Sequence, residues 1–353
     1  MERKIRVLVV DDSAFMRKAL TRMLCSDPMI DVVDTASDGE EGVRKALILR
    51  PDVVTLDVMM PGMDGLTALR RIMAECPTPV LMLSSLTSEG GETTLKALDW
   101  GAADFIDKAS ANTAMDILTI AGELITKVKA LAGVRVANLV RTRPRLTEPA
   151  NALTVKANPN ACAVKVVAIG SSTGGPPALQ TILCSLPEDL PAAVLIVQHM
   201  PKGFTASLAE RLNKLSRLSV KEAEDGDRVA PGRCLIAPSG LHMTVQRNGP
   251  GSVVRLSMDP DGLLHRPSVD VLMNSTAKVF GNGVVGVILT GMGADGAKGI
   301  KAIHDAGGRT IAQDEETSVV YGMPRVAVEL GGVDRSLPLD RVAEGMLEEL
   351  GVA

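Results

Sequence analysis

Short apolar runs alternate with segments of helical periodicity through the first third of the chain. Five of these runs predict strands, and the segments that follow them predict helices. The predicted strands are Ile5–Val10, Asp31–Ala36, Val53–Leu56, Val80–Leu83 and Asp104–Ile106. Such alternation is typical of a parallel sheet with helices on both faces. Polar residues that follow these strands are therefore expected at one edge of the sheet, where ligands bind.

The same pattern returns in the second half of the chain. Buried strands are predicted at Lys165–Ile169, Ala193–Val197, Arg233–Ala237 and Val284–Leu289. Helices are predicted at Pro176–Leu186, Phe204–Leu215, Val269–Phe280 and Ala297–Ala306. Met243–Gln246 and Val253–Met258 alternate apolar with polar residues, which predicts an antiparallel pair at a sheet edge.

Residues 135–162 interrupt the pattern. This stretch carries several arginines together with Pro144, Pro149 and Pro159, and it lacks sustained periodicity. We interpret it as a semi-extended linker, with a basic phosphate-binding tail as the less favoured alternative. The prediction is an α/β protein of two doubly wound domains. Residues 1–134 form the first domain, and residues 163–353 form a second, mainly parallel domain with an antiparallel edge.

Composition agrees with two globular domains. The chain has 353 residues, more than one core usually holds. Aromatic residues make up only 2%, so the cores must be built from aliphatic side chains. The net charge of −4 gives no general affinity for nucleic acid, and no apolar run reaches bilayer length. The five cysteines are scattered and form no CxxC pair, which favours a reducing, cytoplasmic location over a disulfide framework or a zinc site.

Three carboxylates are predicted to meet at the edge of the first sheet. Asp11 and Asp12 follow the first strand, and Asp57 follows the third. A hard divalent cation such as Mg²⁺ would relieve their repulsion, and Asp57 could act as a carboxylate nucleophile toward a phosphoryl group. Ser84 and Lys108 follow two further strands and could contact that phosphoryl group. The alternative for Asp11 or Asp12 alone is a helix N-cap.

A second set of chemical groups lies in the second half. The turn Gly170-Ser171-Ser172-Thr173-Gly174 joins a strand to a helix, and its GxSxG register makes Ser172 the exposed serine. The alternative for this turn is a phosphate cradle, as in a nucleotide-binding module.

His199 follows the next strand, and Asp295 lies in a glycine-rich turn after a later one. Ser172, His199 and Asp295 could then form a proton relay, although Asp295 alone could be a helix N-cap. His242 and His265 lie in loop or edge contexts and remain alternatives as the base. The order Ser, His, Asp differs from that of α/β hydrolases, so a serine hydrolase on another sheet topology is predicted.

The first set of motifs belongs to a recognisable pattern. VVDDS, TLDVMMPGMDG, MLSS and DFIDK together resemble the flavodoxin-like receiver domain of two-component response regulators. The resemblance implies that Asp57 is the phosphoacceptor, and that Asp11, Asp12, Asp57 and the Met59 carbonyl bind Mg²⁺. It also implies a switch set, which consists of Ser84, Phe105 and Lys108. The chain departs from many receivers at Ala109, where proline is common after the lysine.

The second half resembles another family. IGSSTGGP, QHMPKGFT, KEAEDGDRV, IAPSGLHM, HRPSVDVL and VILTGMGADG are similar to the catalytic domain of chemotaxis protein-glutamate methylesterases. The resemblance implies a Ser172–His199–Asp295 triad and a Met292 backbone N–H in the oxyanion hole, with Thr173 beside the nucleophile. It implies no cofactor in the hydrolase site. Many members have alanine where this chain has Ser171.

The family resemblance implies a function in chemotaxis adaptation. The expected reactions are hydrolysis of glutamate methyl esters on chemoreceptor cytoplasmic domains and deamidation of receptor glutamines. A chemotaxis histidine kinase is the expected phosphodonor, and phosphorylation is expected to raise the hydrolase activity. The rival classes are a DNA-binding response regulator, for which no basic recognition helix is evident, and the nucleotide-binding module, which leaves His199 and Asp295 unexplained.

Overall fold

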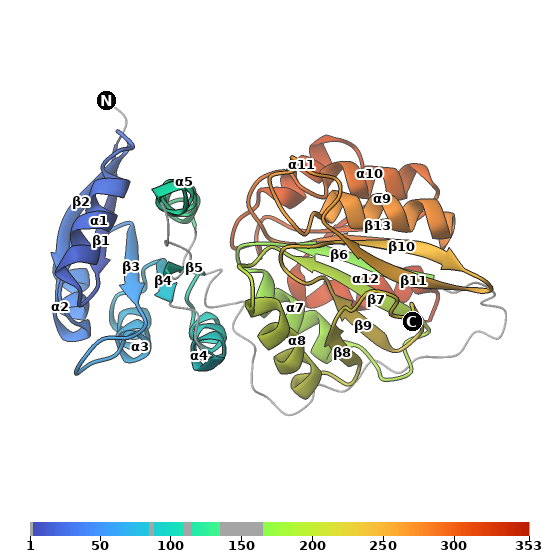
Figure 1. Ribbon diagram of the computed structural model, residues 1–353, viewed down its shortest axis with the longest axis horizontal. Coiled ribbons are helices and arrows are strands. Elements are labelled where there is room, and N and C mark those ends of the chain that lie inside the picture. The colour runs from blue at the N-terminus through green and yellow to red at the C-terminus, as the bar shows by residue number, and fades with distance from the viewer. Residues whose placement is uncertain (1–2, 85–87, 109–113, 135–164, 353) are drawn as a thin grey trace. The chain divides into compact units, whose positions relative to one another are not determined.

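The computed structural model describes residues 3–84, 88–108, 114–134 and 165–352. The chain divides into two compact units, Met1–Arg143 and Pro144–Ala353, each with a sheet of its own (Figure 1). The predicted linker, residues 135–162, lies outside the described residues. No helix in the described ranges has both the length and the apolar character that crossing a bilayer requires.

The first unit is a five-stranded parallel sheet with strand order β2-β1-β3-β4-β5. Its strands are β1 (Ile5–Val10), β2 (Ile30–Ala36), β3 (Val53–Asp57), β4 (Val80–Ser84) and β5 (Asp104–Asp107). Its helices are α1 (Ala14–Leu24), α2 (Gly39–Leu49), α3 (Gly65–Glu75), α4 (Ser88–Asp99) and α5 (Ala114–Leu131). All five predicted strands are confirmed, and their ends lie within one residue of the predicted ones.

Helices cover both faces of this sheet because the chain reverses direction across it. The β1–α1–β2 and β3–α3–β4 connections run toward opposite edges, and crossovers of one hand then lie on opposite faces. Accordingly, α1 packs against α5, and α2 packs against α3. Polar caps fix where the helices start: Asp38 and Asp64 accept hydrogen bonds from Glu41 N and Thr67 N at 2.9 and 2.7 Å.

The second unit contains a seven-stranded parallel sheet with strand order β14-β13-β12-β6-β7-β9-β8. Its strands are β6 (Lys165–Ser171), β7 (Ala192–Gln198), β8 (Ser219–Glu222), β9 (Arg233–Ile236), β12 (Val284–Ile288), β13 (Arg309–Gln313) and β14 (Arg335–Leu337). The helical segments are α7 (Gly175–Ser185), α8 (Phe204–Leu215), α9 (Val269–Phe280), η2 (Gly281–Gly283), α10 (Ala297–Asp305), α11 (Met323–Glu329) and α12 (Leu339–Leu350).

The antiparallel pair predicted from the alternating runs is confirmed. It consists of β10 (His242–Asn248) and β11 (Gly251–Ser257), and it forms a separate two-stranded sheet rather than the edge of the large one. Strands β8, β13 and β14 and helices α11 and α12 were not predicted.

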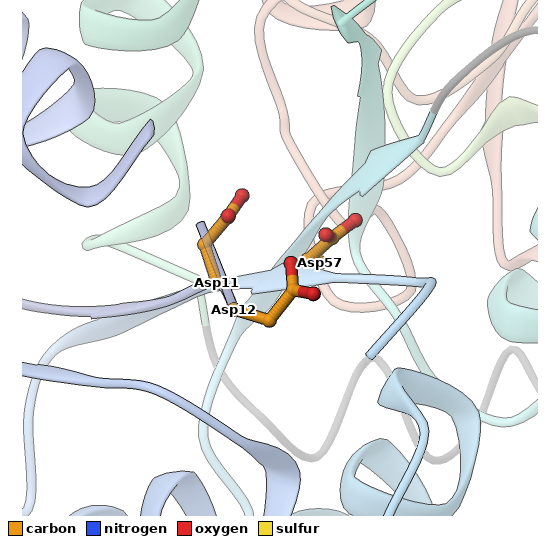
Figure 2. Close-up of side chains that lie close together, drawn as sticks. All are labelled: Asp11, Asp12 and Asp57. Atoms are coloured by element: carbon orange, nitrogen blue, oxygen red, sulfur yellow. The ribbon is translucent and has the colours of Figure 1, made fainter. Parts of the chain in front are cut away.

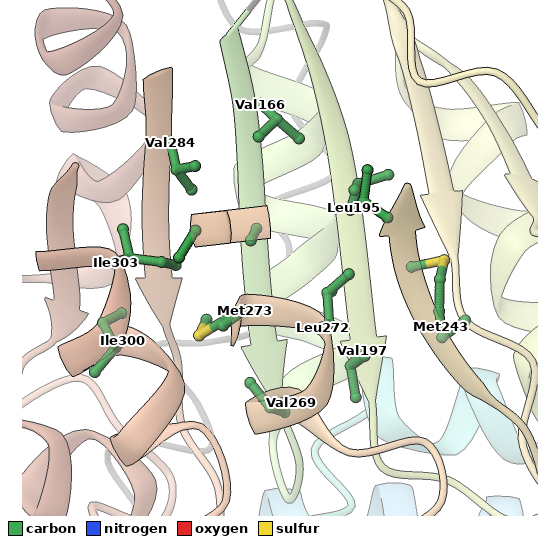
Figure 3. Close-up of a cluster of buried hydrophobic side chains, with 14 of the residues drawn as sticks. Val166, Leu195, Val197, Met243, Val269, Leu272, Met273, Val284, Ile300 and Ile303 are labelled. Atoms are coloured by element: carbon green, nitrogen blue, oxygen red, sulfur yellow. The ribbon is translucent and has the colours of Figure 1, made fainter. Parts of the chain in front are cut away.

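One core cluster of the second unit lies between the large sheet, helices α9 and α10, and the β10–β11 hairpin (Figure 3). The buried members of this cluster are all alanine, valine, leucine, isoleucine or methionine, as the low aromatic content predicted. Val269, Leu272 and Met273 of α9 are fully buried, and each such side chain stabilises the fold by about 1.5–3 kcal/mol. This packing fixes α9 against the sheet.

Each sheet has a switch point, which lies between two neighbouring strands whose following connections run toward opposite edges of the sheet. In the first sheet it lies between β1 and β3, and in the second between β6 and β12. In open α/β sheets, a crevice forms at such a point beside the carboxyl ends of the strands, and ligands bind in it. The topology therefore favours one site in each unit, after β1 and β3 and after β6 and β12.

Candidate active site and acidic cluster

The predicted nucleophile turn lies at the switch point of the second sheet. Strand β6 ends at Ser171, and α7 begins at Gly175. Gly174 has φ of 77°, in the left-handed region that glycine adopts without strain, which lets the chain turn sharply into the helix. The Ser172 N–H donates to the Thr290 carbonyl oxygen at 3.1 Å, which ties the turn to the loop after β12.

The two adjacent serines differ in their surroundings. Ser171 is the last residue of β6, is fully buried, and donates its hydroxyl to Gln198 Oε1 at 2.7 Å. Ser172 is partly exposed. The amide of Gln198 also donates to the Ser172 carbonyl oxygen at 2.9 Å, so this glutamine braces the turn from β7. This difference in exposure favours Ser172 over Ser171 as the group that meets a substrate.

Gly291 brings the loop after β12 against Ser172. A Cβ atom at position 291 would lie 2.8 Å from Ser172 Cβ and 2.3 Å from Met323 Sδ, closer than real Cβ atoms approach. Only glycine fits this position, and the next residue is Met292. The loop that carries Met292 and Asp295 therefore passes directly beside the serine.

His199 and Asp295 form a close pair. His199 Nε2 lies 2.9 Å from Asp295 Oδ2, and both side chains are nearly buried. His199 follows β7, and its N–H donates to the Ser171 carbonyl oxygen at 3.0 Å, so its backbone is fixed beside the nucleophile turn. The other ring nitrogen, Nδ1, is buried and has no hydrogen-bond partner among the described residues. That nitrogen is the one available to a serine hydroxyl.

The first turn of α9 holds the Asp295 carboxylate. Its oxygens accept hydrogen bonds from Ser268 Oγ at 2.8 Å, Val269 N at 2.7 Å and Asp270 N at 3.1 Å. Burial alone would raise the pKa of Asp295, but His199 and the backbone N–H groups of α9 outweigh it and lower that pKa from 3.8 to about 2. A carboxylate at a helix N-terminus is also favoured by the helix dipole.

Sequence reasoning did not find this donor set. Ser268 is the N-cap of α9, and its hydroxyl accepts from Val271 N at 3.4 Å while it donates to Asp295. The available signal was a serine directly before the predicted helix Val269–Phe280. Nothing in the sequence indicated that Ser268 would donate a hydrogen bond to Asp295, which lies 27 residues further along the chain.

The three other histidines have distinct environments. The His265 ring stacks on the His199 ring, with centroids 4.1 Å apart and planes inclined by 20°. His242 is buried and accepts from Ser268 N at 3.2 Å through Nδ1. His304 lies in α10 and contacts Asp305 and Asp334. Among the described residues, only the His199 ring forms a hydrogen bond with Asp295, so the geometry favours His199 as the base.

The predicted acidic cluster lies at the switch point of the first sheet (Figure 2). Carboxylate oxygens of Asp11, Asp12 and Asp57 lie within 4.8 Å of one another. Asp11 and Asp57 are buried, whereas Asp12 is exposed. The side-chain N-cap of α1 is Ser13, so neither Asp11 nor Asp12 has that structural role.

Lys108 bridges two of these carboxylates. Its Nζ lies 2.8 Å from Asp57 Oδ1 and 3.1 Å from Asp11 Oδ2. Burial raises the pKa of Asp57, and the Lys108 ammonium opposes that rise. Three ionised carboxylates facing one ammonium leave two negative charges in excess. Oxygen donors with this charge suit a hard divalent cation.

The other residues of the predicted receiver site lie on or next to strands β3, β4 and β5. Ser84 ends β4, and its hydroxyl accepts from Thr94 Oγ1 at 2.8 Å. Phe105 is buried in β5, its carbonyl oxygen accepts from Lys127 Nζ at 2.7 Å, and the same Nζ lies 5.8 Å from its ring centroid. Met59 N donates to Asp57 Oδ1 at 3.4 Å. Ala109 lies outside the described residues.

Comparison with known proteins gives matches to both units. Residues 167–346 match a family model described as CheB methylesterase, and residues 7–118 match one described as response regulator receiver domain. A protein-glutamate methylesterase/protein-glutamine glutaminase of Symbiobacterium thermophilum is 50% identical over 99% of this chain and 98% of its own length. One of Pyrococcus abyssi is 49% identical over 97% of this chain and 92% of its own length.

A solved structure also matches the second unit. The Thermotoga maritima CheB methylesterase catalytic domain is 44% identical, with a TM-score of 0.52, over 53% of this chain and 98% of that domain.

Proposed function

Because this chain belongs to the CheB methylesterase family and carries a response regulator receiver domain, we propose a specific pair of reactions for its second unit. That unit hydrolyses glutamate methyl esters on chemoreceptor cytoplasmic domains, and it deamidates receptor glutamines. Both reactions replace a group on the same acyl carbon, so one site serves both. The observation that carries this proposal is the His199–Asp295 pair, whose histidine backbone is bonded to the turn of the partly exposed Ser172.

In the first half of the reaction, the Ser172 Oγ attacks the carbonyl carbon of the ester. His199 Nδ1 takes the hydroxyl proton, and Asp295 stabilises the resulting imidazolium through Nε2–H. The tetrahedral intermediate then collapses, the bond to the methoxy oxygen breaks, and His199 returns its proton to that oxygen. Methanol leaves, and the glutamyl group stays on Ser172. With glutamine the carbon–nitrogen bond breaks and ammonia leaves.

In the second half, His199 Nδ1 takes a proton from water, and the hydroxide attacks the acyl carbon. Ser172 leaves with the proton from His199, and a glutamate carboxylate is released. The negative oxygen of each tetrahedral intermediate needs fixed donors. We assign one of them to the Met292 backbone N–H, because Gly291 brings that loop into contact with Ser172.

The pair of neighbouring serines provides the direct test. Ser172→Ala should reduce methanol release from methylated receptor fragments by on the order of 10⁴-fold or more, since the nucleophile is lost. Ser171→Ala is the matched control: the Ser171 hydroxyl is fully buried and does not meet the substrate, so most activity should remain. A fluorophosphonate should label the wild-type protein and the Ser171 variant only. Activity in the Ser172 variant would contradict the assignment.

We propose that the receiver unit controls this activity by phosphorylation of Asp57. Its carboxylate lies at the sheet edge beside Lys108 and receives the phosphoryl group from a chemotaxis histidine kinase. Ser84, Phe105 and Lys108 form the switch set that responds to the phosphoryl group. The population of the active form then rises. Kinase and receptor domains of this kind are cytoplasmic, which is where the reactions would occur.

The acidic cluster fits a Mg²⁺ ion in both charge and chemistry. Asp11, Asp12 and Asp57 supply oxygen donors within 4.8 Å of one another. Their negative charge exceeds that of the one facing lysine, and the Met59 carbonyl is the fourth proposed ligand. A bound cation would supply positive charge opposite the phosphoryl oxygens. Lys108 already neutralises part of the charge on Asp57 and Asp11.

A further inference from the structure

One aromatic contact at the active site has no role in the reaction described above. His265 lies against the face of the His199 ring, with the centroids 4.1 Å apart and the planes only 20° from parallel. His199 itself has a single side-chain hydrogen bond, from Nε2 to Asp295, and its Nδ1 has no partner among the described residues. That single hydrogen bond fixes the position of Nε2 but leaves the plane of the His199 ring free to tilt. A flat ring stacked on its face prevents this tilt.

We propose that His265 is a positioning residue, whose ring stacks on His199 and holds Nδ1 toward Ser172. The inference rests on the proposed function of Ser172 and His199. His265 acts through the flat face of its ring, and it neither donates nor accepts a proton in the reaction. Stacking also favours the imidazolium that forms on His199, because the π face of an aromatic ring attracts a cation.

The segment that carries His265 is anchored to the rest of the site. The carbonyl oxygen of Arg266 accepts from Gly240 N at 3.0 Å, and Arg266 forms an ion pair with Asp261 at 2.6 Å. Three residues after His265, Ser268 caps α9 and donates to Asp295. One short stretch of chain therefore supplies both the stacking ring for His199 and a hydrogen-bond donor for its acidic partner.

The charge state of His265 suits this role. Burial lowers the pKa of His265 most, the neighbouring His199 lowers it as well, and Asp295 raises it less, which together bring this pKa to about 4. His265 is therefore neutral near pH 7 and places no like charge against the imidazolium of His199. The charged groups that face it are His199 and Asp295.

The test compares two substitutions of similar volume in the full-length protein. His265→Phe keeps a flat ring, whereas His265→Leu fills the space without one. The measurement is the second-order rate of labelling by a fluorophosphonate, in which Ser172 displaces fluoride and His199 takes the serine proton. We expect the Phe variant to label within about threefold of wild type and the Leu variant about 10- to 100-fold more slowly. His304→Ala, on α10, is the control and should leave the rate unchanged.

Thermal unfolding of each variant separates positioning from folding. The Leu variant should keep its melting temperature close to that of the Phe variant while its labelling slows. Equal rates for Phe and Leu, whether both fast or both slow, would overturn the proposal, because a flat ring would then make no difference. A wild-type protein that is not labelled at all would instead contradict the proposed function, so the two failures are distinguishable.

Discussion

Asp57 is buried and Asp295 is nearly so, and both lie at the carboxyl edge of a parallel sheet, yet their pKa values move in opposite directions. Burial raises the pKa of Asp57. The pKa of Asp295 falls to about 2 despite its burial. The difference lies in the donors: Asp295 accepts from His199 and from three groups of the α9 first turn. Asp57 has Lys108 at 2.8 Å and one long contact from Met59 N.

The two arrangements suit two kinds of chemistry. A carboxylate whose lone pairs are all occupied is held in one orientation and stays ionised, which is what an imidazolium needs opposite it. A carboxylate that faces one lysine and keeps open lone pairs can bind a cation and attack phosphorus. Burial sets the electrostatic cost in both sites, and the number of fixed donors decides the sign of the pKa shift.

Replacing Asp295 should have the largest effect that this comparison predicts. In Asp295→Asn, the amide keeps the shape but can donate to His199 Nε2. That nitrogen then becomes the acceptor, so the proton moves to Nδ1, which can no longer accept from Ser172. We expect kcat for methyl ester hydrolysis to fall on the order of 10⁴-fold, with the fold retained.

The check on this prediction is kcat measured on methylated receptor fragments, with circular dichroism as the folding control. A fall of less than about tenfold would mean that Asp295 does not set the tautomer of His199. The contrast between Asp57 and Asp295 would then not explain how Asp295 contributes to catalysis.

Replacing Asp57 should change regulation and leave basal chemistry intact. Asp57→Asn removes the nucleophilic carboxylate with little change in volume, and Ser172 and His199 belong to the other unit. We expect basal esterase activity equal to wild type and complete loss of activation by acetyl phosphate with Mg²⁺. Phosphate incorporation and esterase rate should be measured on the same samples.

Lys108→Ala provides the contrast to that variant. It keeps the acceptor but loses the ammonium that bridges Asp57 and Asp11. Phosphate should still be incorporated, and the gain in esterase rate should be smaller than in wild type. Full activation of the Asp57→Asn variant by acetyl phosphate would contradict the assignment of the acceptor.

Much of this architecture was predictable because its strands are buried on both faces. Runs such as Ala192–Val197 of β7 read as continuous apolar segments, and the polar residues at their ends stand out. The strands that were missed are those with weaker apolar patterns. β8 (Ser219–Glu222) and β14 (Arg335–Leu337) are short, partly exposed edge strands, and β13 carries Thr310 and Gln313 inside the sheet.

The support around the candidate active site was less predictable than its central residues. Ser172, His199 and Asp295 follow strands, so topology alone suggests that they meet. Ser268 and His265 reach the site through a loop, and their partners lie far away in the sequence. Hydrogen bonds and ring stacking between distant segments leave no periodic signal, so only coordinates reveal them.

The smallest expected effect is a change in stability at low pH. The folded pKa of Asp295, about 2, lies below its ordinary value of 3.8, so the native state binds this proton less readily than the unfolded chain. The stabilisation is therefore complete above about pH 5 and is lost as the pH falls toward 2, and it amounts to about 2 kcal/mol. Asp57, whose pKa is raised, should show no such loss.

Asp295→Asn isolates this contribution because asparagine does not titrate. The free energy of unfolding of the second unit, from urea titrations between pH 6 and pH 2.5, should fall more steeply in wild type than in the variant. Asp57→Asn is the matched control and should not reduce the slope in the same window. Parallel curves for wild type and Asp295→Asn would show that the α9 donors do not favour the ionised carboxylate, and the contrast between the two sites would fail.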